Sequence, residues 1–391
     1  MSMQNFLTIE KGMQDYFLPA WGNQIGNKAC AFMASIEKEN FEGGKAIYTA
    51  AEIGYSGGFG FGSEGKGNAP IAGEQRIEGF TIPIRDMYTT IELSDKAIRL
   101  STGQSLLNAF ETEINAAYKT AEWNVARALF GKEDGKLATF GDVSGQVASV
   151  SEVNKIKEGF TVDLHDTLGS IQKVRVIGVD RKNKRVAFNK ALTVSEGFIT
   201  IQGSYGKELI GLGALLDEEA DIYGNKRTDD QNYYLRPVID SCDKALGVTD
   251  IEIDRVLRIA EREKGSKVNM LMFGDKAYEQ YVRYLRETNR RADNNVSLEG
   301  GFNAIKYSYG TVDINIVNEQ FVPENEVWGV DTTKFKFQAT PWDFVAKEGA
   351  AFSRMEGSSN FQALLASYGN LVCSNPGGCI KLTDCNPAVS A

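Results

Sequence analysis

The chain has 391 residues, of which 42% are hydrophobic, and its 43 basic and 52 acidic side chains give a net charge of −9. This length predicts two or three domains with a core that needs no disulfide or metal, and the hydrophobic content excludes a disordered or low-complexity chain. The acidic charge disfavours dedicated nucleic-acid binding, and the single histidine, His165, excludes multi-histidine zinc sites and two-histidine iron sites.

The first 43 residues are predicted to form an N-terminal arm, with a short helical patch near 28–39. The scattered polar residues before it are typical of a segment that packs on another surface. The start shows no basic segment followed by an apolar run, so we expect no signal peptide. No stretch of about 18 apolar residues predicts a membrane-spanning helix.

Residues 44–92 predict a long β-hairpin with a glycine-rich tip. In the return arm, Ile77, Phe80, Ile82 and Ile84 approximate the period of two that is typical of a strand. Seven of the 40 glycines fall within residues 54–67, between the two arms. Because an isolated two-stranded hairpin is marginally stable in water, we expect this one to lie on another protein surface.

The strongest helix signal runs from Gln104 to Phe130, where apolar residues recur at spacings of three and four. Ser105 is expected to cap its start, and Gly131 is expected to follow its end. A helix of about 25 residues spans about 37 Å, which is typical of a spine rather than of a short packing element.

Residues 143–205 predict an inserted β-rich module. Its apolar residues alternate in several short runs, such as Val162 and Leu164 or Val186 and Phe188, and charged turns separate the runs. Several short strands at regular spacing favour a small barrel or sandwich.

Residues 206–301 predict a layer of helices and a buried strand. Thr249-x-x-Glu252 is a capping-box pattern before a helix, and Asp275 is expected to cap a second helix. The apolar run at 267–273 between them is a candidate for a buried strand.

After residue 301 the chain is predicted to be β again. Val312, Ile314 and Ile316 alternate, and a turn at Pro323 leads to the next strand. We assign residues 373–391 to a C-terminal tail.

The glycine-rich loop contains a formal dinucleotide-binding pattern, Gly60-x-Gly62-x-x-Gly65, and nearly matches a phosphate-binding loop that ends at Lys66. A phosphate-binding loop needs Ser or Thr after the lysine, and here Gly67 follows. Both motifs also need a helix directly after the loop, and the Asn-Ala-Pro sequence that follows does not start one. We therefore expect a flexible loop tip and no cofactor.

No catalytic, cofactor-binding or metal residue is predicted, and we expect a protein that is not an enzyme. His165 lies in the β-rich module without a nucleophile motif such as Gly-x-Ser-x-Gly, so we expect it to be a surface residue. An odd number of cysteines with no Cys-x-x-Cys pattern predicts surface or semi-buried thiols in a reducing cytoplasm. The five cysteines are Cys30, Cys242, Cys373, Cys379 and Cys385.

The order of these features resembles the major capsid proteins of tailed bacteriophages, which have the Hong Kong 97-like fold. The resemblance is carried by the hairpin at 45–92, the segment 93–101 that leads into the spine helix, and the later segments 309–327 and 368–376. The resemblance is diffuse and covers about residues 30–380. It rests on the order in which these features follow one another, and not on any single motif.

The resemblance implies an α+β Hong Kong 97-like fold with peripheral and axial domains and a small inserted β-rich domain. The extended loop would reach over a neighbouring subunit, and the spine helix would form the peripheral domain together with the late β segment. The expected divisions are 1–43 as the N-terminal arm, 44–92 as the extended loop, 93–142 as the spine helix, 143–205 as the insert, 206–301 as the axial domain, 302–372 as peripheral and axial β segments, and 373–391 as the tail.

The implied function is that of a major capsid protein, which self-assembles into pentamers and hexamers of an icosahedral head around double-stranded DNA. The chain would be found in the virion after assembly in the bacterial host cytoplasm. Its implied partners are other copies of itself, a separate scaffolding protein, a portal and a decoration protein, with non-specific contact to packaged DNA and none to a membrane. Candidate assembly residues are Phe59, Phe61, Glu64, Lys66, Arg85 and Glu92.

The resemblance implies that Lys66, near the loop tip, would correspond to the lysine through which some members of the family cross-link covalently to a neighbour. Other functions also stay open. An encapsulin-type cargo shell shares the fold, and a cargo enzyme encoded beside the chain would favour it. The 4 Trp and 15 Tyr residues, which can stack on sugars, leave room for a β-rich glycan-binding or carbohydrate-active protein. A nucleotide-dependent enzyme is a further alternative, in which the glycine-rich loop would bind the nucleotide.

Overall fold

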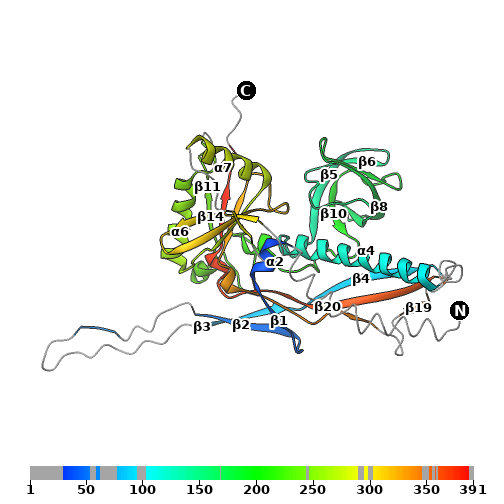
Figure 1. Cartoon of the computed structure of the whole chain (residues 1–391), viewed down its shortest axis with the longest axis horizontal. Coiled ribbons are helices and arrows are strands. Elements are labelled where there is room, and N and C mark those ends of the chain that lie inside the picture. The colour runs from blue at the N-terminus through cyan, green and yellow to red at the C-terminus, as the bar shows by residue number, and fades with distance from the viewer. Residues whose placement is uncertain are drawn as a thin grey trace.

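The computed structural model shows three bodies and a projecting hairpin (Figure 1). A sheet flanked by helices lies on one side, a barrel stands beside it, and the long helix α4 runs beneath the barrel along two long strands. This arrangement is α+β, as the sequence predicts. The residues that the structure describes are 30–52, 59–61, 77–94, 103–167, 169–243, 246–288, 295–297, 303–345, 352–354, 357 and 360–386.

The predicted spine helix is present as α4 (Gly103–Leu129), and it packs against strand β4 (Arg85–Leu93). Its buried residues include Ile114, Ala121 and Val125, which lie on the apolar face expected from their spacing. We call the sheet beneath it the spine sheet. In the spine sheet β20 (Phe361–Cys373) pairs with β4, β17 (Phe335–Ala339), β18 (Asp343–Phe344) and β19 (Phe352–Arg354), and β1 (Glu37–Asn40) pairs with β17.

The predicted hairpin is confirmed for β2 (Ala46–Glu52) and β3 (Ile77–Pro83), which pair antiparallel over their whole length. Its base is held by Ile47, Phe80 and Ile82, which are buried in the main core. The second half of the expected return arm is different, because β4 pairs with β20 instead of continuing the hairpin. The break follows Pro83, which has no N–H to donate to a ladder.

We call the second sheet the axial sheet. It contains seven strands among the residues that the structure describes. Its order is β11 (Val238–Ser241), β21 (Ile380–Thr383), β16 (Val327–Val330), β12 (Met270–Phe273), β15 (Val312–Asn318), β14 (Asn303–Tyr309) and β13 (Asn295–Ser297). Helices α6 (Asp250–Lys264) and α7 (Asp275–Glu287) belong to this body (Figure 1). As predicted, Thr249 is the N-cap residue of α6, although its side chain makes no capping hydrogen bond.

Two expectations about this region are wrong. The late β segment, β15 and β16, pairs with β12 in the axial sheet and does not lie with the spine helix. The segment assigned to a tail contains β21, which lies between β11 and β16. The sequence signal for β21 is weak because the strand has four residues, of which only Ile380 and Leu382 point into the core.

The inserted module is a closed barrel within residues 136–201, which the structure describes apart from 168. It begins at Lys136, earlier than the expected boundary at 143, because the chain enters its first strand a few residues after α4. The alternating residues Val162, Leu164 and Val186 point into a core separate from the rest of the chain. The barrel strands are β5 (Lys136–Ser144), β6 (Val147–Val150), β7 (Thr161–Asp166), β8 (Ile171–Asp180), β9 (Arg185–Phe188) and β10 (Gly197–Ile201).

The expected surface positions of His165 and the cysteines are wrong. His165 lies on the outer side of the barrel, but its ring stacks on Phe198 at 4.7 Å and also contacts Tyr205, so it is buried. All five cysteines are buried, where they pack as small apolar side chains. The remaining short elements are α2 (Ala31–Ser35), α5 (Leu212–Leu215), η1 (Asp230–Leu235), η3 (Thr332–Lys334) and η4 (Pro376–Gly378).

Candidate functional site

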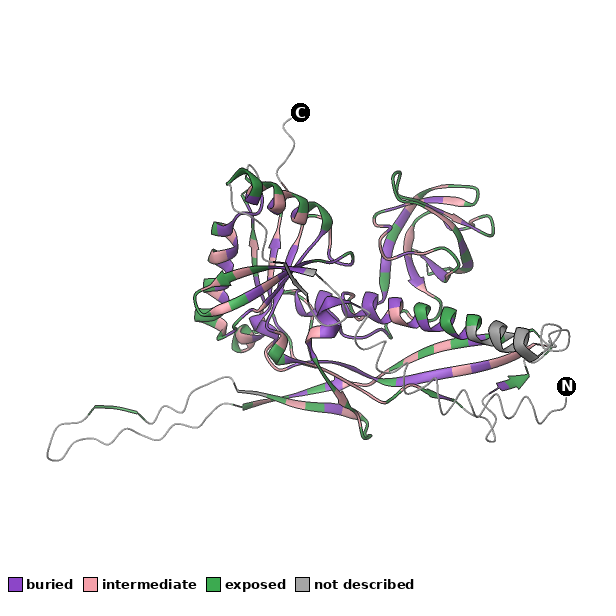
Figure 2. Ribbon diagram, viewed as in Figure 1, coloured by how far each residue is buried: buried purple, intermediate pink, exposed green. Residues whose placement is uncertain are grey.

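The hairpin exposes several large apolar side chains among the residues that the structure describes. It extends from the base of the molecule in the direction opposite to α4 (Figure 1), and most of its described surface is exposed (Figure 2). Among its described residues, Tyr48, Ile77, Phe59 and Phe61 are large apolar side chains that face solvent. Exposed apolar side chains on a two-stranded hairpin indicate a surface that another protein covers.

Two of the predicted assembly residues, Phe59 and Phe61, lie together in this element. Their exposed fractions are 81% and 95%, and their rings meet edge to face with centroids 5.1 Å apart. Glu64 and Lys66 lie outside the described residues, so the cross-linking hypothesis for Lys66 stays a prediction.

Arg85 and Glu92 lie elsewhere, near opposite ends of β4. Arg85 forms an ion pair with Glu133, and burial lowers the pKa of its guanidinium. Its Nε atom has no hydrogen-bond partner among the residues that the structure describes. Glu92 accepts a hydrogen bond from Asn360 Nδ2 at 2.7 Å. The four of these residues that the structure describes therefore do not form one site within a single chain.

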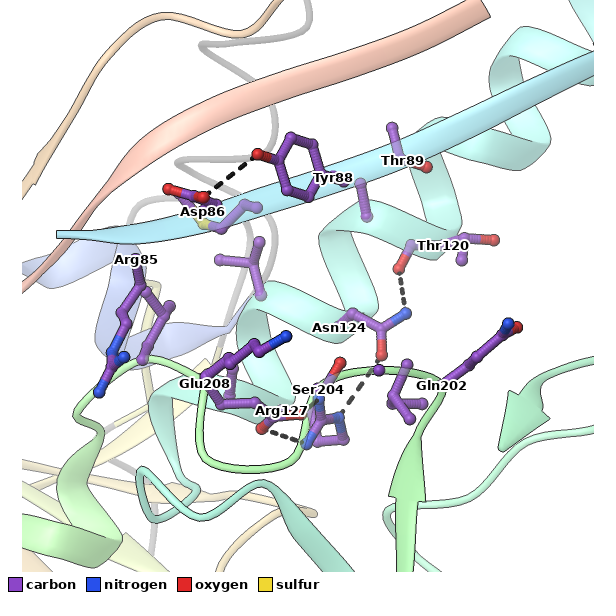
Figure 3. A pocket seen from close by; sticks show the side chains of 18 of the residues that line it. Arg85, Asp86, Tyr88, Thr89, Thr120, Asn124, Arg127, Gln202, Ser204 and Glu208 are labelled. Atoms are coloured by element: carbon purple, nitrogen blue, oxygen red, sulfur yellow. Dashed lines mark hydrogen bonds and ion pairs between the residues drawn. The ribbon is translucent and has the colours of Figure 1, made fainter. Parts of the chain in front are cut away.

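A pocket of about 480 Å³ lies where β4, α4 and the segment 201–209 meet, and we call it the spine pocket (Figure 3). Its wall is partly apolar, with Ile84, Met87 and Trp342 among the lining side chains. Thr120 on α4 also lines it and is exposed. The pocket therefore offers apolar surface beside polar groups, which suits an amphipathic protein segment.

A buried ion pair holds one wall of the spine pocket. Arg127 on α4 donates from Nη1 to Glu208 Oε2 at 2.9 Å and from Nη2 to Glu208 Oε1 at 2.6 Å. Both side chains are almost completely buried. Asn124 extends the network, since its Oδ1 lies 3.5 Å from Arg127 Nε and its Nδ2 donates to Thr120 O at 2.9 Å (Figure 3). The ion pair therefore holds the segment after the barrel against α4, which precedes the barrel.

Asn370 fixes the other side of the same junction. Its side chain is fully buried; Nδ2 donates to Pro83 O at 2.9 Å, and Oδ1 accepts the Ile210 N–H at 3.0 Å. Close to it, a Cβ atom on Gly211 would lie 2.4 Å from Ala128 O, so only glycine lets this segment meet the end of α4. Asn370 thereby joins β20, the end of the hairpin and the chain that follows the barrel.

Sequence reasoning missed these junction residues. Arg127 and Glu208 are 81 residues apart, and Ile210 and Asn370 are 160 apart. Arg127 lies beside the apolar face of α4 rather than on it, and no local pattern names its partner. The one available signal was an arginine within the last, mostly apolar turns of a long helix.

The described part of the chain shows neither a candidate metal site nor a membrane-spanning helix. No cluster of three or more His, Cys, Asp or Glu side chains among these residues could hold a metal ion. No described helix is long and apolar enough to cross a membrane.

Glu319 is a buried titratable group after β15. Burial raises the pKa of its carboxyl from 4.5 to about 7, although the backbone N–H groups of Gln320 and Phe321 donate to it. Because the fold favours the protonated form, this group stabilises the chain fully below pH 4.5, and the contribution is lost as pH rises to about 7.

The variant Glu319→Gln is expected to lose this pH dependence. Between pH 4.5 and 8 the free energy of unfolding of the wild type should fall relative to the variant by about 3 kcal/mol. Urea unfolding at several pH values measures the difference between the two curves. Parallel curves over this range would show that Glu319 titrates normally.

The comparisons with known proteins concern the whole chain. No protein-family model matches the sequence, and no curated protein does. Among solved structures, the capsid protein of cyanophage A-1(L) is 13% identical, with a TM-score of 0.52 over 92% of this chain and 93% of that one.

Two further solved structures are similar over most of their length. A capsid chain of a native GTA particle is 9% identical over 92% of this chain and 90% of that one, with a TM-score of 0.48. The holo-SrpI encapsulin of Synechococcus elongatus PCC 7942 is 9% identical over 90% and 85%, with a TM-score of 0.43. The likeness to the cyanophage protein extends over nearly the full length of both chains, so this chain has the Hong Kong 97-like fold of tailed-phage capsid proteins.

Proposed function

We propose that the chain is the major capsid protein of a tailed phage, which self-assembles into pentamers and hexamers of an icosahedral head that encloses double-stranded DNA. The observation that carries this proposal is the hairpin, which leaves the body of a chain with a capsid fold and exposes four large apolar side chains among its described residues. An exposed apolar surface of this kind is expected to be covered by another protein. In a shell, a neighbouring subunit covers the hairpin of each chain.

The proposed partner of the hairpin is a second copy of the chain, and its docking place is the spine pocket. The hairpin and α4 extend in opposite directions from the body (Figure 1), so a contact between the hairpin of one copy and the α4 region of the next is head to tail. Head-to-tail contacts generate rings when the rotation closes. The exposed Phe59 and Phe61 match the apolar part of the pocket wall, which includes Met87 and Trp342.

The other bodies have proposed places in the shell. The axial sheet with α6 and α7 would surround the fivefold and sixfold axes, and the spine sheet with α4 would form the periphery. The barrel has a core of its own and stands apart from the spine sheet, so we place it on the surface of the shell. A net charge of −9 favours a container that does not hold its own DNA tightly.

The remaining partners are proposed from the role of a major capsid protein. A separate scaffolding protein would guide assembly, a portal would occupy one vertex, and a decoration protein would bind outside. The chain would assemble in the host cytoplasm and remain in the virion, without catalysing a reaction.

Mass measurement of the native species tests the proposal. The chain, expressed alone and together with a scaffolding protein, is expected to form capsomers or shells of thousands of kilodaltons that electron microscopy shows as closed particles. A species of 42.9 kDa under every condition would contradict it. Particles that enclose a protein instead of DNA would identify an encapsulin-type cargo shell.

A further inference from the structure

Two buried cysteines from distant parts of the chain meet at the edge of the axial sheet. Cys242 directly follows β11, Cys385 follows β21, and their Sγ atoms lie 3.2 Å apart. We propose that Cys242 and Cys385 form an intramolecular disulfide when the chain meets a thiol oxidant. The bond itself does not depend on the proposed capsid function.

The backbone on both sides of the pair is already in place. The Cys242 N–H donates to Thr383 O at 2.9 Å, and the Cys385 N–H donates to Asn325 O at 2.9 Å. The Val248 N–H donates to Cys385 O at 3.2 Å. Since a disulfide has an S–S length of about 2.05 Å, the two sulfurs need to approach by roughly 1 Å, which side-chain rotation supplies.

The environment of Cys385 makes its thiol slow to react. The hydrogen bond between the two thiols, together with burial, raises the pKa of Cys385 above its usual range. The thiolate, which is the reactive form, is therefore rare at neutral pH. Cys385 follows the exposed Asp384 in the chain, and local opening of the segment after β21 would bring its sulfur to solvent.

The reaction balances with a small disulfide such as oxidised glutathione as the oxidant. One protein thiol loses its proton, and its sulfur attacks the glutathione disulfide, which releases one glutathione and leaves a mixed disulfide on the protein. The second protein thiolate attacks the protein sulfur of that mixed disulfide, forms the Cys242–Cys385 bond and releases the second glutathione. The protein loses two hydrogens, and one glutathione disulfide is reduced to two thiols.

The bond would close a loop between residues 143 positions apart, which includes most of the axial sheet. It would join the chain after the edge strand β11 to the chain after the neighbouring strand β21. A cross-link over so long a loop removes much of the freedom of the unfolded chain. If the chain forms a virus shell, as proposed above, the bond would form after release from the reducing host and would harden the particle outside the cell.

The test uses the full chain in oxidised glutathione at pH 8, with a second sample refolded from urea in the same buffer so that access to the thiols is not limiting. Alkylation under denaturing conditions and peptide mapping then locate the bond. We expect a protein lighter by about 2 Da, with Cys242 and Cys385 in one linked peptide. The thermal midpoint should rise by about 5 °C, and dithiothreitol should reverse the rise.

Single variants separate this bond from other oxidation. Cys242→Ala and Cys385→Ala should lose both the linked peptide and the rise in thermal midpoint, and Cys30→Ala, which removes another buried cysteine, should retain both. Cys373 and Cys379 also share a side-chain hydrogen bond and serve as an internal comparison. The proposal is overturned if Cys242 and Cys385 remain alkylatable in both samples, or if the map links only Cys373 to Cys379. Neither outcome depends on whether particles form.

Discussion

Replacing Phe59 and Phe61 together with serine is expected to abolish particle formation and leave the fold intact. Both rings are exposed and contact each other, so their loss removes little internal packing. A truncated aromatic anchor at an interface costs about 2 kcal/mol or more, so two of them weaken each subunit contact about a thousandfold. Because a shell repeats the contact at every position, native mass measurement should find unassembled chains with an unchanged thermal midpoint.

Two further variants make this result specific. Ile171→Ser with Ile177→Ser removes two apolar side chains that are 58% and 59% exposed on the barrel, and this variant should still assemble. Thr120→Trp fills the spine pocket from its exposed rim and should block assembly as the hairpin variant does. If Thr120→Trp assembles normally but the hairpin variant does not, the hairpin docks on a different surface.

Removal of Arg127 is expected to cause a large loss of stability. Arg127→Met leaves Glu208 buried without its bidentate partner, and breaking a buried ion pair in this way costs about 3–5 kcal/mol. Urea unfolding followed by tryptophan fluorescence measures the change, since Trp123 lies on the same helix.

The double variant Arg127→Met with Glu208→Leu should recover most of this loss, because apolar side chains of similar size replace the pair without leaving a charge uncompensated. Lys132→Met is the exposed control. Its ion pair with Asp217 is 2.6 Å long, but the lysine is 55% exposed, so its loss should cost less than about 1 kcal/mol. A small effect of Arg127→Met would mean that water reaches Glu208.

Elements with a strong local period were predictable from the sequence. The spacing of Ile114, Ala121 and Val125 predicts α4, and the helix ends close to Gly131 as expected. Alternation predicts the barrel strands and the base of the hairpin, because the side-chain period of a strand directly reports which face is buried. Four-residue strands such as β21 carry too few periods for the same reasoning.

The candidate site was only partly predictable. The sequence and its family resemblance predict Phe59 and Phe61 as candidate assembly residues, and the structure finds both side chains exposed. The spine pocket was not predicted, because its walls come from β4, α4 and the segment after the barrel. The positions of Arg85 and Glu92 at separate ends of β4 likewise depend on how that strand pairs with β20.

By itself, the sequence determined the type of each long element, the acidic character of the chain, and an ordered resemblance to phage capsid proteins. The tertiary structure decided which strands pair, where the buried ion pair of Arg127 and Glu208 lies, and that Cys242 meets Cys385. The reason is the range of the interactions. Periodicity reflects burial within one element, whereas a polar pair or a thiol pair depends on two elements brought together by the whole fold.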